Sequence, residues 1–485
     1  MIFLALLLSA EVAVLCAAVI LREPNLLIPA VVLGLPIEYV GTQALGTLSE
    51  GGLSGAVRAL LNPGKAAMLA SIVVAVFRAR HNPSKLFPDS AVIVPIVALL
   101  SVVVLGVAWS DSLKPENSIL IMPMYVAFVF VAPTLIEDRK DVERIVGAFL
   151  LIAAMLALVA ISQRLFHVFN WRAILVQSDD YSYRSNATFA DPNNLARYFA
   201  VSMSLAVGLL LSTGPRRQTV YLAIPALALS AAGIVATASR SGWLMLVFCT
   251  FLVVLVSPIS RYTKGKLVFG SAGALVAMLV LLLFQGGTDA ERVKSLASGV
   301  QVIGQREFLI KAGWQMFKDS PFIGVGSGNY QHALVVSDLD LIPSWARTTL
   351  SHTSLVSLLA ELGIVGMLAF LLVVVRVGIS MVRAYFATAV EYNRLIIGWL
   401  GASTIGILLV SQSEGRLLDE PYLWLILAMF VALETGAGFS DVSLAGAVRV
   451  EERDPVRTVR SPATGNLRAP RQPHEVSSVG AAQTD

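Results

Sequence analysis

Long apolar segments that hold no charged residue recur along most of the chain, and they limit its fold more than any other feature. The hydrocarbon core of a bilayer is about 30 Å thick, and a helix rising about 1.5 Å per residue needs about 20 apolar residues to cross it. The segments that reach or approach this length are residues 90–110, 117–136, 145–163, 198–215, 218–239, 241–260, 267–288, 395–413 and 421–433.

Four further segments are candidates although they contain charge, and 60–77 is the weakest of them. Segment 353–375 is apolar except for Glu361, and segments 1–21, 24–40 and 60–77 each contain a charged residue. Together the segments predict an all-α fold: a polytopic integral membrane helix bundle of about 12 to 13 transmembrane helices, with one long extracytoplasmic loop.

The low charge content agrees with this prediction. Only 14% of the 485 residues are charged, whereas charged residues make up about a quarter of an ordinary soluble domain. Such a surface excludes a soluble enzyme, a secreted disulfide scaffold and a nucleic-acid-binding domain as the main body. The net charge of +4 is small for this length and indicates no nucleic-acid partner.

The cysteines and histidines give no sign of a metal site. Cys16 and Cys249 lie far apart in apolar segments, which is typical of small core residues. The five histidines show no paired ligand spacing. We therefore expect neither a metal nor another cofactor.

Basic loops alternate with loops poor in Lys and Arg, and basic loops tend to be cytoplasmic. The basic loops lie near residues 78–85, 139–144, 216–217, 261–266 and 376–394. This assignment predicts three regions: N-terminal transmembrane helices at 1–162, a second transmembrane region at 163–438 with an extracytoplasmic loop at 285–351, and a tail at 439–485. The tail shows no apolar periodicity, so we expect it to be disordered and cytoplasmic.

Two polar features on the predicted outer side adjoin spans. The segment from Arg184 to Asn194 contains Asp191-Pro-Asn, which is typical of a helix start, so it is either a cap or part of a site. Arg240 lies in the short SRSG turn between two spans, where a lone cation is costly. It is either an interfacial anchor or an anion-binding residue, and the rarity of outer-side Arg favours the second.

Two more features follow within and after the long loop. Arg306 opens a helical pattern whose apolar stripe suits a helix that lies on the membrane or packs over the spans, and the glycine-rich GVGSGN segment follows it. His352 stands where the loop re-enters the membrane. Glu361 lies inside the next span, where an ionisable residue is a functional candidate by default.

These segments together resemble the O-antigen ligase and O-antigen polymerase superfamily of bacterial membrane glycosyltransferases. The segments that carry the resemblance are FADPNNLA at 189–196, SRSG at 239–242, Arg306 with Trp314, DSPFIGVGSGNY at 319–330, HTSL at 352–355 and ELG at 361–363. They cover about residues 180–370, so the second region, 163–438, is the O-antigen ligase-like part.

The resemblance implies a metal-independent glycosyltransferase in the bacterial cytoplasmic (inner) membrane, with its active site facing outward. It would transfer a glycan from a polyprenyl diphosphate carrier, surrounded by membrane lipids, to a glycan, lipid or protein acceptor. Arg forks bind diphosphate oxygens well, which favours Arg240 and Arg306 as catalytic residues. His352 suits a base for the acceptor hydroxyl. Arg184, Asn193 and Glu361 are candidates for binding substrate.

The sequence leaves two alternatives open. A ligase and a polymerase differ in their acceptor, which the residues do not identify. A transporter for a polyprenyl-linked glycan or another solute is a further alternative, although transporters usually place charged residues near the midplane of interrupted helices.

Overall fold

In a computed structural model of the chain, the described residues are 11–18, 22–38, 62–112, 117–169, 184–212, 217–270, 273, 300–337, 353–415 and 417–435. They all belong to one compact unit, Met1–Ala447. The predicted tail at 439–485, and most of the predicted span at 267–288, lie outside the described residues.

The described residues form helices and no strand, which confirms the predicted all-α fold. Five helices are long and apolar enough to cross a membrane: α9 (Arg139–Phe166), α11 (Pro192–Leu211), α12 (Arg217–Thr237), α18 (Ser354–Ala387) and α19 (Glu391–Glu414). These helices are those of a polytopic membrane bundle, as the apolar segments predict.

Further helices, most of them shorter, belong to the part of the chain that the structure describes. They are α2 (Leu27–Gly34), α6 (Pro63–Arg78), α7 (Ile93–Leu105), α8 (Met122–Val131), α13 (Arg240–Val256), α16 (Val300–Asp319), α17 (Tyr330–Ser337) and α20 (Pro421–Glu434). The weakest predicted span, 60–77, thus overlaps the 16-residue helix α6.

Helix starts follow local capping chemistry. Asp138 begins α9 in a capping box with Asp141, and Asp191 begins α11 by accepting the backbone N–H of Asn193 at 2.7 Å. Ser239 begins α13 by accepting the N–H of Gly242 at 3.2 Å. Each side chain satisfies an N–H group that the first helical turn leaves without an intrahelical partner.

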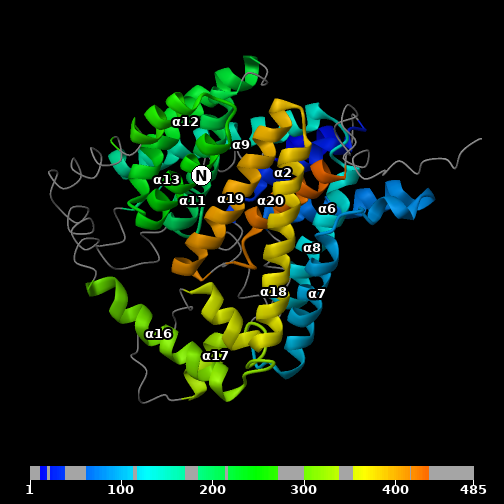
Figure 1. Ribbon diagram of the computed structural model, residues 1–485, viewed down its shortest axis with the longest axis vertical. Helices are drawn as coiled ribbons and strands as arrows, with labels where there is room; N and C mark the ends of the chain where they lie inside the picture. The colour runs from blue at the N-terminus through cyan, green and yellow to red at the C-terminus, as the bar shows by residue number, and fades with distance from the viewer. Residues whose placement is uncertain are drawn as a thin grey trace, which may run out of the picture. The chain divides into compact units, whose positions relative to one another are not determined.

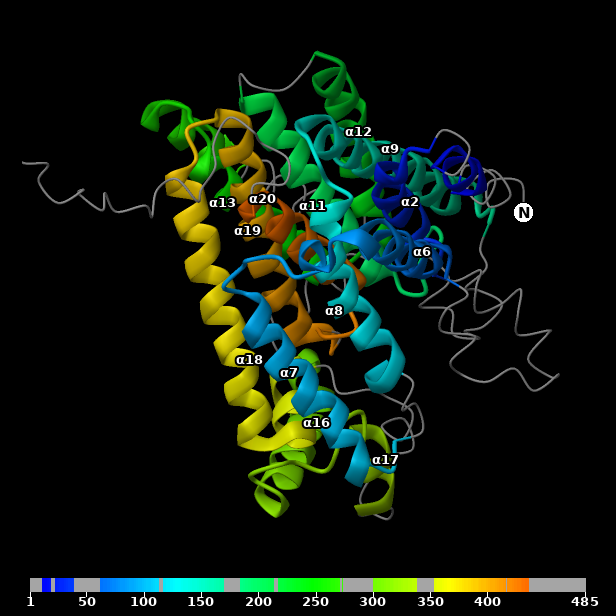
Figure 2. The same ribbon diagram turned by 90° about the vertical axis from the view of Figure 1, so that its right-hand side faces the viewer.

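Helix α11 lies at the centre of one helix group, packed against α9, α12, α13 and α19 (Figures 1 and 2). Its buried aromatic ring Tyr198 stacks on Phe149 of α9, with centroids 5.9 Å apart, and Tyr422 of α20 lies 5.2 Å from it. The indole of Trp399 donates to the carbonyl of Val201 at 3.0 Å. Large aromatic surfaces therefore join the four helices α9, α11, α19 and α20.

A second group surrounds the start of α18. Helices α16 and α17 lie beside that end, and α7 packs along α18, as both views show. The apolar stripe of α16 supplies the contact, because Leu309 and Met316 are buried with Ala360 of α18 and Tyr330 of α17. The predicted stripe therefore packs over a span.

One ion pair is buried in the core. Arg197 of α11 pairs with Glu420 at the start of α20, and their side chains are only 2% and 6% exposed. Removing water from two charges is costly, and their attraction offsets this cost only while both are present. The pair therefore joins the start of α20 to α11.

We expect Arg197→Met to destabilise the fold by about 3–5 kcal/mol, because it leaves Glu420 as a buried charge without its partner. Arg197→Met combined with Glu420→Leu should recover most of that loss. The measurement is the midpoint of thermal unfolding in detergent, with Arg383→Met at an exposed site as control. A double variant no more stable than Arg197→Met would contradict this account.

Candidate functional site

Two sequence-predicted segments meet where α11 and α13 begin. The guanidinium of Arg184 donates from Nη2 to Oδ1 of Asn193 at 2.7 Å and from Nε to the carbonyl of Thr237 at 3.0 Å. The hydroxyl of Ser239 donates to the same Asn193 oxygen at 2.8 Å. We call Arg184, Asn193, Ser239 and Arg240 the arginine cluster.

Local structure explains why these residues converge. Helix α12 ends at Thr237, Ala238 takes a left-handed conformation with φ of 48°, and α13 begins at Arg240. A side chain at Gly242 would bring its Cβ within 2.3 Å of the Cβ of Ala196. The start of α13 therefore lies directly against the first turns of α11.

The cluster concentrates positive charge at the ends of helices. Arg184, Asn193 and Arg240 are half-buried, and Ser239 is fully buried. The bonds to Thr237 and Asn193 hold the Arg184 guanidinium in one orientation before any ligand arrives. Helix N-termini add partial positive charge. The arrangement suits an anion with several oxygens, because an Arg fork binds such groups through parallel N–H donors.

Glu361 holds the glycine-rich loop at residues 324–330. Its two carboxylate oxygens accept the backbone N–H groups of Gly328 at 2.9 Å and Tyr330 at 3.0 Å. The hydroxyl of Tyr330 donates to the carbonyl of Leu309 in α16. The carboxylate in α18 therefore fixes the loop that joins α16 to α17.

A break in helix α18 positions the glycine-rich loop. Gly363 has φ of 60° and ψ of −160°, which interrupts the helical hydrogen bonds. Val325 and Gly326 donate to the carbonyls of Ala360 and Glu361, each at 2.9 Å, and Ile364 donates to the carbonyl of Pro321 at 2.9 Å. Backbone groups that the break exposes are thus satisfied by the loop.

Glycine is required on both sides of this contact. A Cβ at Gly324 would lie 2.3 Å from the carbonyl carbon of Glu361, and a Cβ at Gly363 would lie 2.4 Å from that of Phe322. Both residues also have positive φ. Gly324 and Gly363 therefore allow two backbone segments of the chain to approach closely, in agreement with the predicted tight loop.

The remaining predicted residues are only partly covered by the structure. Arg306 lies on the helical backbone of α16, but its side chain is outside the described residues, and so is His352. The first turn of α18, just after His352, is held by α19, since Ser354 donates to the carbonyl of Ser411 at 2.8 Å. Helix α16, which carries Arg306, packs on α18, the helix that follows His352, through Leu309, Met316 and Ala360.

Residues 417–420 lie between the glycine-rich loop and α11, the helix that carries Asn193 of the arginine cluster. Asp419 is close enough to Glu361 for their charges to repel, and the adjacent Glu420 pairs with Arg197 of α11. Sequence reasoning did not identify Arg197 or Glu420 as a pair. A cation within the apolar region of α11 was the available signal, because such a charge needs a partner.

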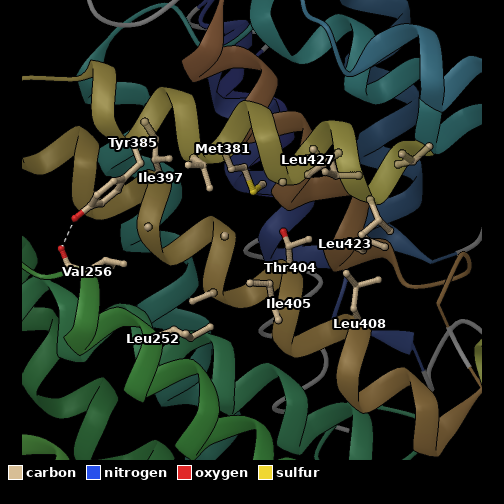
Figure 3. A pocket seen from close by; sticks show the side chains of 18 of the residues that line it. Leu252, Val256, Met381, Tyr385, Ile397, Thr404, Ile405, Leu408, Leu423 and Leu427 are labelled. Atoms are coloured by element: carbon tan, nitrogen blue, oxygen red, sulfur yellow. Dashed lines mark hydrogen bonds between the residues drawn. The ribbon is translucent and has the colours of Figure 1, made fainter. Parts of the chain in front are cut away.

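An apolar groove of about 370 Å³ lies between α13, α18, α19 and α20 (Figure 3). Its lining includes Leu252 and Val256 at the end of α13 opposite to Arg240, and Tyr385 donates to the Val256 carbonyl at 2.6 Å. The groove presents almost no polar group, so it does not have the chemistry of an anion site.

Comparison with known proteins identifies the region. Residues 225–371 match the family model described as O-Antigen ligase. The matched range includes Arg240, Arg306, the glycine-rich loop, His352 and Glu361, while Arg184 and Asn193 precede it. A search of curated proteins finds no match.

The match supports a function in ligating or polymerising glycans at a membrane and suggests an enzyme of the glycosyltransferase type. It agrees with the apolar helices, which are those of a multi-pass membrane protein. Residues 225–371 of the chain are thus similar to the O-antigen ligase family.

Proposed function

We propose that the protein transfers a glycan from a polyprenyl diphosphate carrier to an acceptor hydroxyl on the outer face of the bacterial cytoplasmic membrane. The observation that supports this proposal best is the arginine cluster, in which Arg184 is oriented by Thr237 and Asn193 beside Arg240. The family match adds the reaction class, the joining of glycans.

The reaction needs an anion site and a base. The acceptor oxygen forms a bond to the anomeric carbon, the bond from that carbon to the diphosphate oxygen breaks, and the electron pair leaves with the diphosphate. Arg240 and Arg306 stabilise the charge that develops there, and Arg184 binds the donor beside them. His352 takes the proton of the acceptor hydroxyl. In this proposal the arginines supply the positive charge and no metal is required.

Asn193 and Glu361 have positioning roles in the proposal. Asn193 orients Arg184 through its amide oxygen, and Glu361 holds the loop between α16 and α17. Direct contact of either residue with substrate stays a prediction.

The function is tested with purified protein, a lipid-linked oligosaccharide, candidate acceptors and EDTA, by measuring free polyprenyl diphosphate and glycosylated acceptor. We expect both products in equal amounts. Movement of the intact lipid-linked donor across the bilayer, with no release of diphosphate, would contradict transfer and support the transporter alternative. Loss of activity in EDTA that added metal restores would contradict metal independence.

Arg240→Lys and Arg184→Lys test the anion site. Lysine keeps the charge but loses the bidentate fork, so we expect at least a tenfold loss of transfer, about 1.4 kcal/mol or more in transition-state stabilisation. Arg383→Lys, at the opposite end of α18 from Ser354, is the matched control and should retain full activity. Unchanged donor binding and turnover in both test variants would exclude the cluster as the diphosphate site.

His352→Ala tests the base. General bases contribute about 100- to 10,000-fold to rate, so we expect a loss of transfer in that range with donor binding retained. Donor affinity and single-turnover transfer should be measured separately. Normal turnover in this variant would end the proposed role of His352, and loss of donor binding alone would assign it to binding.

The outward orientation predicts that a cysteine at Ser337, the last residue of α17, reacts with an impermeant thiol reagent in intact cells or spheroplasts. A cysteine at Ser295 should react likewise. A cysteine at Lys264, in a predicted cytoplasmic loop, should react only after lysis. The opposite result would invert the topology and place the arginine cluster in the cytoplasm.

A further inference from the structure

One face of α18 is exposed and apolar along most of the helix. The exposed residues on it are Ile364, Val365, Leu368, Leu371, Leu372, Val375, Ile379, Val382 and Phe386. Steps of three or four residues keep these side chains on one side of a helix. In a membrane-spanning helix, such a continuous apolar face is the surface that contacts lipid.

This lipid-facing surface continues beyond α18 onto the loop that precedes the glycine-rich segment. Ile364 and Val365 donate their N–H groups to the carbonyls of Pro321 and Phe322, at 2.9 and 3.2 Å. Beside them, the side chains of Phe322 and Ile323 are 70% and 48% exposed. Two large apolar side chains therefore extend the face at the level of the helix break.

The charged residues of α18 indicate that the helix break lies within the membrane. Arg383 and the aromatic residues Tyr385 and Phe386 lie near the C-terminal end, where such residues mark a membrane interface. Arg376 also belongs to this basic end, and counting about 20 residues back from Arg376 and Arg383, the length needed to cross the hydrocarbon core, leads to residues 356 and 363. Phe322 and Ile323, beside Ile364 and Val365, are thus level with the half of that core nearer the N-terminal end of α18.

The backbone of the turn is suited to this position. Pro321 has no N–H group, and the carbonyls of Pro321 and Phe322 already accept hydrogen bonds from α18. Irregular backbone is tolerated at membrane depth only where its polar groups have partners. The carbonyls of Pro321 and Phe322 are therefore satisfied where the two side chains enter hydrocarbon.

The exposed side of helix α16 is apolar along one edge and basic along the other. Ile310 and Trp314 are exposed along one edge, and Lys311 and Lys318 are exposed along the other. Tryptophan favours the interface between hydrocarbon and headgroups, and lysine extends to the phosphates. A helix of this kind lies on a membrane surface.

We propose that the Pro321–Ile323 turn is a membrane anchor: Phe322 and Ile323 insert among the lipid chains of the leaflet at the N-terminal end of α18, and α16 lies along the surface of that leaflet. The anchor does not depend on the transfer reaction. Its consequence is that α16, which carries Arg306, is held at the depth where the headgroup of a lipid-linked molecule lies.

The test uses the full chain in liposomes, with Cys16 and Cys249 replaced by alanine and a nitroxide attached to a cysteine at Phe322 or Ile323. Collision with oxygen, which concentrates in hydrocarbon, is compared with collision with a water-soluble nickel chelate. Leu368, which is 60% exposed on the lipid-facing surface, is the reference for lipid. Lys311, which is 74% exposed on α16, is the reference for the aqueous side.

We expect the oxygen-to-nickel ratio at Phe322 and Ile323 to be several-fold above that at Lys311 and to approach that at Leu368. A ratio equal to that at Lys311 would place the turn in water and overturn the proposal. Low collision with both reagents would also overturn it, because another protein surface, such as a second copy of the chain, would then cover the turn. Transfer assays are separate, so a negative result here leaves the proposed reaction unaffected.

Discussion

Backbone groups that lie in apolar surroundings must find hydrogen-bond partners within the protein, and the break in α18 depends on this constraint. Gly363 interrupts the helix, and the loop that precedes α17 supplies donors and acceptors to the groups on either side. These hydrogen bonds need the backbone of the loop to approach that of α18 closely, which Gly324 and Gly363 permit. Helix α16, the loop and α18 therefore form one connected unit.

Charge in a low-dielectric region is the second constraint. Arg197 lies in the core because Glu420 neutralises it, and Arg184 lies half-buried because Thr237 and Asn193 accept its N–H groups. Each guanidinium is thereby held in one orientation. A site that is oriented before its ligand arrives stabilises developing charge without reorganising, which is the main requirement for catalysis at an anionic leaving group.

The two constraints meet at the segment that precedes α20. Asp419 lies near Glu361, which holds the glycine-rich loop, and Glu420 pairs with α11, which carries Asn193. The segment therefore adjoins both the residue that holds the loop and the helix that carries Asn193.

Local patterns predicted much of the fold and part of the site. Asp191 was recognisable as the start of a helix because capping depends on residues two or three positions away. Ser239, which the sequence placed in a turn between two spans, begins α13 in the same way. The contact between Asn193 and Ser239 was not predictable, since 46 residues separate them and no periodicity relates them. Glu361 was identified as a candidate, but its partners Gly328 and Tyr330 became apparent only in the structure.

The sequence by itself determined that this is a helical membrane protein, because the length and composition of the apolar segments depend only on neighbouring residues. It also determined which charged residues are unusual, because a cation in or beside an apolar span is costly wherever it lies. The tertiary structure decided which of these charges meet, as in Arg197 with Glu420 and Arg184 with Asn193. Such pairings depend on how separate helices pack, and helix packing is decided by shape and hydrogen bonding between residues far apart in the chain.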